Sequence, residues 1–302
     1  MSDGPSTPSR PASTYAAPLT AQRKRVALVI GAGSVKCAAA LGLWRTLVRA
    51  GIGLDMVVGC SGGSMYASMM ALGFDHETCE RLTRELWTRK ITQRRNTRGL
   101  LAAFLPKLFG FDGNFGMVDD RAVGEALAGP LGGRRFDEAI IPLHVVATDF
   151  MTGERVVLSE GSVFDAVRAS IAIPYVWRPW KVGDRLLMDG CMSDPLPVDV
   201  AIREGAQVIL AMAFESPFPR RIKSATRFAF QVNSVYTNNL LRANYAFHNL
   251  AHHTEIIPVL PEFDSEIGLF DTHKIPHVIE QGERATEAQL PYLQRLLDGI
   301  AV

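Results

Sequence analysis

The residues most able to do chemistry stand in Gly59-Cys60-Ser61-Gly62-Gly63, which matches the pattern G-x-S-x-G. An apolar run precedes the motif and a run of small, helix-compatible residues follows it, so Ser61 is expected at a sharp strand-to-helix turn. Glycines at such a turn let the two elements pass closely, and the helix N-terminus adds partial positive charge. A plain glycine turn with a serine N-cap is the alternative, and the strand and helix on either side favour a nucleophile.

A serine nucleophile needs backbone donors for the oxyanion, and a second glycine-rich turn could supply them. Gly31 to Lys36 follows the apolar run Arg25 to Ile30 and is expected to open a helix, with its amides unpaired. A dinucleotide-binding fingerprint would require glycine where Lys36 stands, and a phosphate-binding P-loop would require G-K-[ST]. The turn therefore predicts an oxyanion site rather than a nucleotide site.

The base that activates Ser61 has two possible sources. An α/β-hydrolase order would pair Ser61 with Asp149 or Asp189 and a later histidine; the histidines available are His252, His253, His273 and His277. These histidines fall at the tail of an expected helix or in a polar turn, and only one strand and one helix precede Ser61. The second source is Asp189 alone, because a carboxylate at the end of a strand can reach the same sheet edge as the serine.

Strands and helices are expected to alternate along the chain. Apolar, β-branched runs predict strands within 25–30, 54–59, 142–150, 155–161, 185–190, 208–214 and 255–260. Helical spacing predicts helices over 37–50, after Ser61, and over 164–170, 197–204, 227–252 and 275–297. This alternation indicates an α/β layer fold with a mostly parallel sheet. We expect residues 1–23, rich in Ser and Pro, to be a disordered leader and residues 24–302 to form a single domain.

Composition excludes several classes of protein. The chain has 302 residues and a formal net charge of +1, so no global charge favours nucleic acid as a partner. The four cysteines show no zinc-type spacing and no disulfide framework, which predicts no metal site and a reducing, cytoplasmic setting. No apolar run approaches the ~18 residues of a membrane-spanning helix.

Taken together, the three motifs resemble the patatin-like phospholipase family. That family has a G-G-G-x-[RK]-G loop, a G-x-S-x-G elbow and a D-G-[GA] turn. The similar segments here are Gly31 to Lys36, Gly59 to Gly63, and Asp189-Gly190 followed by "DPLPV". The segments 147–154 and 169–177 are also similar to family stretches. The match covers nearly the whole chain from about Lys24, in the correct order.

The resemblance implies a three-layer α/β/α fold and a Ser/Asp dyad that needs no histidine and no cofactor. Ser61 would attack the ester carbonyl of a phospholipid, lysophospholipid or related lipid, Asp189 would take the serine proton, and an acyl-serine would form. Backbone amides near Gly33, Ser34, Val35 and Gly62 would bind the oxyanion, and Gly59, Gly63 and Gly190 would support the elbow and the turn. An acyltransferase with the same dyad, or a lipid-binding scaffold without turnover, remain alternatives.

The chain departs from the family pattern mainly at cysteines. Cys37 stands where the loop ends in glycine, and Cys191 follows Asp189-Gly190 where glycine or alanine is usual. Cys60 precedes Ser61 directly. Two interpretations stay open: these thiols regulate activity by oxidation, or they are small packing residues. Lys36 matches the basic residue of the family's loop and is expected to position that loop.

Two further segments concern partners. Lys90 to Gly116 combines basic and apolar residues, which suits either peripheral contact with anionic lipid or a cap helix packed on the sheet. The long helix expected near 228–250 carries apolar residues on more than one face. It could pack on the core, line an acyl pocket or mediate oligomer formation, and the sequence does not choose among these.

Overall fold

A computed structural model of the chain describes residues 23–88, 90–110, 113, 115–215, 221–251, 254–264, 267–268 and 271–298. The expected leader, 1–23, lies outside the described residues except for Arg23, whose guanidinium pairs with Asp55 at 2.6 Å. Within the described chain, no helix combines the length and the apolar character needed to cross a bilayer.

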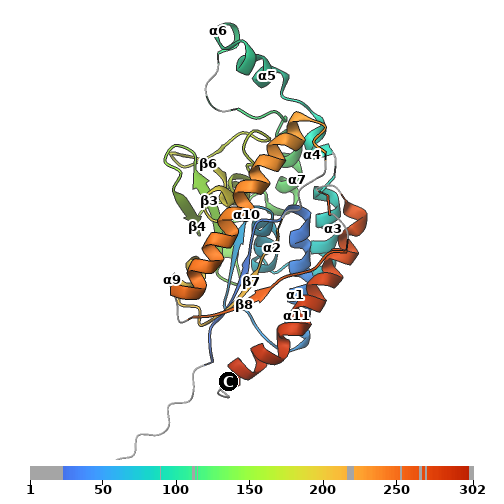
Figure 1. The fold of residues 1–302 in the computed structure, drawn as a ribbon, viewed down its shortest axis with the longest axis vertical. Helices are drawn as coiled ribbons and strands as arrows, with labels where there is room; N and C mark the ends of the chain where they lie inside the picture. The colour runs from blue at the N-terminus through green and yellow to red at the C-terminus, as the bar shows by residue number, and fades with distance from the viewer. Residues whose placement is uncertain are drawn as a thin grey trace, which may run out of the picture.

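A single mixed sheet forms the centre of the described structure (Figure 1), in the order β5-β6-β3-β2-β1-β7-β8 with β4 paired to β3. The pairs from β3 through β2, β1 and β7 to β8 are parallel, and β4, β5 and β6 join by antiparallel pairs. The mostly parallel sheet expected from the sequence is confirmed. The strands are β1 Val26–Ile30, β2 Met56–Cys60, β3 Leu143–Asp149, β4 Arg155–Leu158, β5 Trp180–Val182, β6 Arg185–Asp189, β7 Val208–Met212 and β8 Glu255–Val259.

Helices cover both faces of this sheet. The α-helices are α1 Ala39–Arg49, α2 Gly62–Ala71, α3 His76–Leu86, α4 Lys90–Gln93, α5 Thr97–Phe104, α6 Pro106–Phe109, α7 Arg121–Leu131, α8 Val163–Ser170, α9 Val198–Arg203, α10 Ala225–Ala251 and α11 Ile275–Leu297. Short 3₁₀ turns occupy Ser34–Ala38 (η1), Phe136–Glu138 (η2), Gly190–Met192 (η3) and Thr272–Lys274 (η4). The helix expected over 37–50 therefore begins as a 3₁₀ turn and is α-helical from Ala39.

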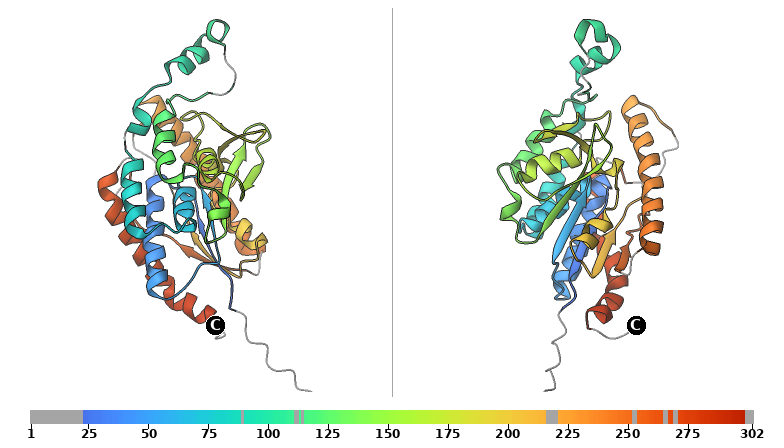
Figure 2. Two further views of the ribbon diagram at one scale, coloured as in Figure 1. Left: turned by 180° about the vertical axis from the view of Figure 1, so that it is seen from behind. Right: turned by 90° about the vertical axis from the view of Figure 1, so that its left-hand side faces the viewer.

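Alternation along β1 explains the layers, because successive side chains of a strand point to opposite faces. Val26, Leu28 and Ile30 belong to one core cluster, with apolar residues of α1, α2 and α11. Ala27 and Val29 belong to a second cluster, with residues of α9 and α10. Figure 2 shows the long α10, in orange, along one face of the sheet, with the helices of the other face opposite it. The three-layer α/β/α arrangement is thus confirmed.

Two differences from the expected elements have local causes. The strand β5 was not expected, because its three residues Trp-Lys-Val are too few for a periodic pattern. The segment between α3 and α7 forms the short helices α4, α5 and α6 rather than one cap helix. Pro106 begins α6 and Gly110 ends it in a left-handed conformation, φ 65°, so the chain cannot continue as a longer helix.

Candidate active site

The side chains of Ser61 and Asp189 meet at the edge of the sheet. The Ser61 hydroxyl donates a hydrogen bond to Asp189 Oδ2 at 2.8 Å, and Asp189 Oδ1 accepts one from the Cys191 amide at 2.9 Å. Asp189 is fully buried and Ser61 is 7% exposed. Both carboxylate oxygens therefore have donors, and the side that faces the serine is shielded from bulk water.

The register of the sheet explains how residues 128 positions apart come together. Cys60, which ends β2, pairs with Val146 of β3, and Ala147 pairs with Asp189 of the antiparallel β6. The strand β3 thus extends beyond the end of β2, and β6 runs back along that extension until it stops beside Ser61. Asp189 thus reaches the sheet edge at the end of a strand that runs antiparallel to β3, a direction that the sequence argument did not specify.

The backbone at Ser61 is strained, with φ 52° and ψ −129° in the sparsely populated region that non-glycine residues seldom adopt. Neighbouring hydroxyls hold it there. The Ser61 amide donates to Ser170 Oγ at 2.9 Å, and Ser170 Oγ in turn donates to the Val146 carbonyl at 2.6 Å. Ser64 Oγ donates to the Ser61 carbonyl at 2.6 Å. These contacts fix the hydroxyl of Ser61 toward Asp189.

The glycines around the dyad are required for close approach. A Cβ at Gly63 would lie 2.3 Å from the carbonyl oxygen of Ile30, so α2 could not pass so near β1. A Cβ at Gly190 would lie 2.3 Å from the carbonyl oxygen of Val146. At Gly59 it would lie 2.5 Å from Ser64 Cα. The turn after β6 and the elbow after β2 thus both depend on residues without a side chain.

Burial raises the pKa of the Asp189 carboxyl group. Loss of hydration disfavours the charged form and raises the pKa of Asp189 from 3.8 to about 6, and the hydrogen bonds from the Cys191 amide and the Ser61 hydroxyl oppose this rise. A carboxylate with this pKa is a stronger base than a free aspartate and is still mostly ionised at neutral pH. The arrangement can therefore accept a proton from the serine hydroxyl.

A narrow cavity of about 10 Å³ lies over Ser61, enough for roughly one water molecule. Ser34 and Gly62 line it, and they approach closely, since a Cβ at Gly62 would lie 2.8 Å from the Ser34 amide nitrogen. Each begins a helix, η1 and α2 respectively, where amides have no partner within the helix. Gly33 faces the ring of Phe214 instead, and the Val35 side chain is buried in the core. The structure thus brings Ser34 and Gly62 to Ser61.

Comparison with known proteins identifies the family of the chain. A family model described as patatin-like phospholipase matches residues 28–202, more than half of the chain. The chain belongs to the patatin-like phospholipase family. Membership in this family supports lipid acyl hydrolysis as the general class of activity.

The relatives of this patatin-like chain are distant. An uncharacterised NTE family protein of Mycobacterium bovis is 27% identical over 227 residues, which are 75% of this chain and 58% of that protein. Patatin-like phospholipase domain-containing protein 7 of Mus musculus is 27% identical over 190 residues, 62% of this chain and 13% of that protein. The chain thus spans less than two thirds of the length of either relative.

Two solved structures also align with the patatin-like chain. VipD from Legionella pneumophila has 14% identity and a TM-score of 0.47, covering 89% of this chain and 67% of that one. The type III effector ExoU has 16% identity and a TM-score of 0.46, covering 90% and 53%.

The geometry of the patatin-like site does not favour the histidine-dependent alternative. The Ser61 hydroxyl donates to Asp189, while His277 lies 3.9 Å from Glu280 on α11. His252 and His253 lie outside the described residues. The carboxylate of Asp149 accepts hydrogen bonds from the amides of the tight turn after β3, so it organises that turn. Asp189 is the acid that the fold brings to the serine.

The cysteines near the dyad are buried. Cys37 Sγ donates to the Gly31 carbonyl at 3.3 Å, and a Cβ at Gly190 would lie 3.0 Å from Cys60 Sγ. Burial raises the pKa of the Cys37, Cys60 and Cys191 thiols, so little thiolate forms at neutral pH. These features favour the packing role over regulation by oxidation.

Lys36 has a defined structural contact in the loop before α1. Its ammonium group donates to the Glu215 carbonyl at 2.7 Å and is largely buried, and loss of hydration lowers its pKa to about 8. This bond ties the loop of Ser34 to the chain that follows β7, consistent with the expected positioning role.

Sequence reasoning missed two contributors to the site. Ser170 bridges the Ser61 amide and the Val146 carbonyl, and Thr148 Oγ1 donates to the Asp189 carbonyl at 2.9 Å. Both lie in stretches noted only for their resemblance to the family, 147–154 and 169–177. The signal available was that resemblance, because isolated hydroxyl residues carry no spacing that predicts a contact with a strand 24 residues away.

Proposed function

We propose that the chain is a serine esterase that cleaves acyl esters of phospholipids or lysophospholipids, with Ser61 as nucleophile and Asp189 as base. The observation that carries the proposal is the 2.8 Å hydrogen bond from the Ser61 hydroxyl to the fully buried Asp189 carboxylate. The family's general activity supports the lipid substrate class. We take residues 24–302 as the catalytic unit.

In the proposed cycle, Asp189 accepts the proton of Ser61 and returns it to the leaving alcohol. Ser61 Oγ attacks the ester carbonyl carbon while its proton passes to Asp189 Oδ2, and the tetrahedral oxyanion accepts hydrogen bonds from the Ser34 and Gly62 amides. Gly33 and Val35 flank Ser34 in the chain. The carbon–oxygen bond to the leaving alcohol then breaks, and the alcohol takes the proton from Asp189. Water attacks the acyl-serine by the same route and releases the fatty acid and free Ser61.

We also propose that the α5–α6 hairpin contacts the lipid surface. It projects from the top of the body in Figure 1 and exposes Phe104 (81%) and Leu108 (77%) to solvent. The side chains of Arg98 and Lys107 are exposed on the same hairpin. Exposed apolar side chains next to cations suit the interface of an anionic bilayer. The fraction of protein that sediments with vesicles should decrease in the Phe104→Ser variant, and also when the anionic lipid is left out of the vesicles. An equal fraction in all cases would refute this contact.

Product analysis tests the proposed reaction. Purified protein is incubated with a phospholipid and with the matching lysophospholipid, with and without an added alcohol, and free fatty acid is quantified. Turnover should disappear in Ser61→Ala and fall by roughly 10²–10⁴-fold in Asp189→Asn, with folding retained. A new ester in the presence of the alcohol would indicate an acyltransferase. No turnover of any ester in folded protein would favour a binding scaffold.

A further inference from the structure

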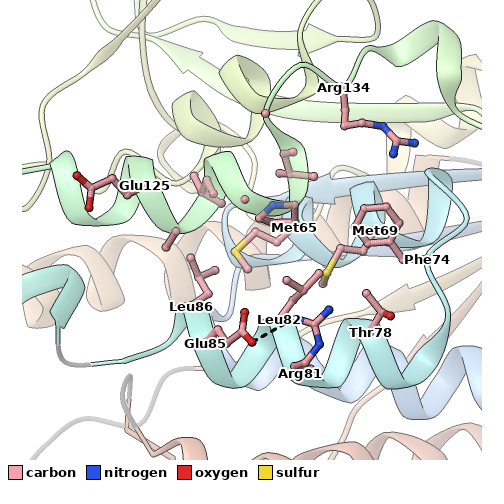
Figure 3. Close-up of a pocket in the computed structure, with 16 residues that line it drawn as sticks. Met65, Met69, Phe74, Thr78, Arg81, Leu82, Glu85, Leu86, Glu125 and Arg134 are labelled. Carbon is pink, nitrogen blue, oxygen red and sulfur yellow. Dashed lines mark hydrogen bonds and ion pairs between the residues drawn. The ribbon is translucent and has the colours of Figure 1, made fainter.

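A groove of about 660 Å³ lies between α2, α3 and α7, beside the serine cavity (Figure 3). This volume is within the range of small-molecule sites, roughly 300–1,000 Å³. In Figure 3, Met65 and Met69 project from α2 into the space between α7 and α3. The apolar side chains that line the groove and bear on its occupant are Met65, Met69, Phe74, Leu82, Leu86 and Ala126.

The groove is apolar inside and charged at its margin. Met65, Met69 and Leu86 are buried members of the main core cluster, so they present apolar surface to the groove. At the margin, Arg81 pairs with Glu85 at 3.2 Å. The four charged residues that line the groove are two cations and two anions, Arg81, Arg134, Glu85 and Glu125. Their charges balance, so the margin does not favour an anion and the apolar interior suits a hydrocarbon.

The groove and the serine cavity share a wall. Met65 and Leu86 line both spaces, and Met65 lies one helical turn after Ser61 on α2. Methionine is unbranched and adapts its shape easily. A change of the Met65 rotamer can therefore join the two spaces, whereas a branched residue there would hold the wall fixed.

The length of the groove sets the size of the occupant. It follows α3 from Thr78 to Leu86, which is about 12 Å at the rise of an α-helix. An extended chain advances roughly 3.5 Å for every three bonds, so this length takes a chain of about ten carbons. A short acyl group would not reach the far end at Thr78 and Phe74.

We propose that this groove receives the acyl chain of the substrate, with the ester at Ser61 and the methyl end toward Phe74, and that it selects chains of about ten carbons or more. This proposal rests on the proposed function. A second pocket of about 430 Å³ is lined by Tyr175, Trp177 and Tyr236 among others; of the described residues, only Trp177 also lines the serine cavity. It is the competing position for the chain.

Binding of a fatty acid tests the groove without requiring catalysis. We would titrate the 302-residue Ser61→Ala protein with cis-parinaric acid, a fluorescent fatty acid, and add Ala126→Phe to fill the groove. Ala126 is half-buried and lines the groove, while Ala128 is exposed on the same helix and lies outside it, so Ala128→Phe is the matched control. If the phenyl ring excludes about two methylene groups of the fatty acid from the groove, the affinity for the fatty acid should fall roughly 10-fold in Ala126→Phe and stay unchanged in Ala128→Phe.

Two further variants and two ester substrates make the outcome decisive. Leu82→Gln changes the polarity of the groove without adding volume and should also weaken binding, so the test survives if Ala126→Phe folds poorly. In the protein with Ser61 intact, Ala126→Phe should slow cleavage of a dodecanoyl ester and leave a butanoyl ester unchanged. Val232→Phe fills the second pocket, which Val232 lines, and should have no effect.

Equal binding by the Ala126→Phe and Ala128→Phe proteins would overturn the proposal, as would loss of binding in Val232→Phe alone. Undetectable binding in the Ser61→Ala protein would overturn it as well. Failure of the proposed function has a different signature: the fatty acid binds with the expected pattern of variants, but no ester is cleaved by the protein with Ser61 intact.

Discussion

Replacement of Asp189 by asparagine should abolish the base and, at neutral pH, stabilise the fold. The amide keeps the shape of the carboxyl group: one oxygen can still accept from the Cys191 amide, and the NH₂ group can donate to Ser61 Oγ. What changes is charge. The wild-type carboxylate is buried, and its two hydrogen-bond donors, the Ser61 hydroxyl and the Cys191 amide, are uncharged. Burial raises the pKa of Asp189 from 3.8 to about 6.

The size and sign of the effect follow from this pKa. At pH values between 3.8 and about 6, Asp189 is protonated in the native state and ionised in the unfolded state. The free energy of unfolding therefore decreases as pH rises through this range, and the decrease is complete above about pH 6. Integration from about pH 4.5 to about pH 7.5 gives a loss of ~2 kcal/mol in the wild type. The asparagine side chain of the Asp189→Asn variant cannot titrate, so the variant does not lose this amount.

Urea unfolding at the two pH values measures the difference. The free energy of unfolding of Asp189→Asn, relative to wild type, should shift by ~2 kcal/mol in favour of the variant on going from the lower to the higher pH. Ser61→Ala is the control, since it keeps the carboxyl group. Its stability should still fall as pH rises, at least as much as in the wild type, because the Ser61 hydroxyl no longer lowers the pKa of Asp189. An equal difference at both pH values would refute the raised pKa and, with it, the claim that burial makes Asp189 an effective base.

Two other substitutions test the geometry around the dyad. Gly190→Ala should lower the free energy of unfolding by about 1–3 kcal/mol, because its Cβ would lie 2.3 Å from the Val146 carbonyl oxygen. The control Gly124→Ala, on α7, places its Cβ in open space and should be neutral or stabilising. Similar shifts of the melting temperature in both variants would contradict this argument. Ser170→Ala should cost about 1–3 kcal/mol and reduce turnover, because the Ser61 amide loses its acceptor. Its counterpart Ser68→Ala should be nearly neutral, since the buried Ser68 hydroxyl has no partner among the described residues; a larger loss for Ser68 would refute the argument.

Much of the fold was predictable because its elements have clear periods. The apolar run of β1 and the helical spacing of α11, predicted at 275–297 and found at those bounds, come from strong local patterns. The motif around Ser61 predicted the elbow for the same reason, since strand, glycine and helix follow one another directly.

The sequence predicted that Asp189 could reach Ser61, but not the strand pairing that brings the two residues together. The residues of β6 do not determine its direction. The strand begins exposed and then alternates between half-buried and buried residues, which fits a parallel or an antiparallel neighbour. The contact depends on β6 running antiparallel and stopping beside Ala147, which is a property of pairing register. Likewise, the position of Ser34 against Gly62 depends on how two loops meet, and no spacing within either loop contains that information.

The groove beside α7 could not have been predicted from sequence. Met65, Leu86 and Ala126 come from three helices, and each looks like an ordinary core residue within its own helix. Only the packing of α3 and α7 around α2 leaves space between them and places its wall at the serine cavity.

Labelling with a fluorophosphonate tests the central claim most directly, because the reagent traps an activated serine regardless of the natural lipid. Intact-mass and peptide analysis should show one adduct, on Ser61. The rate should rise with pH through about 6 as Asp189 loses its proton, and it should fall by roughly 10²–10⁴-fold in Asp189→Asn. No adduct in folded protein, or equal labelling of Asp189→Asn, would contradict the Ser61/Asp189 dyad.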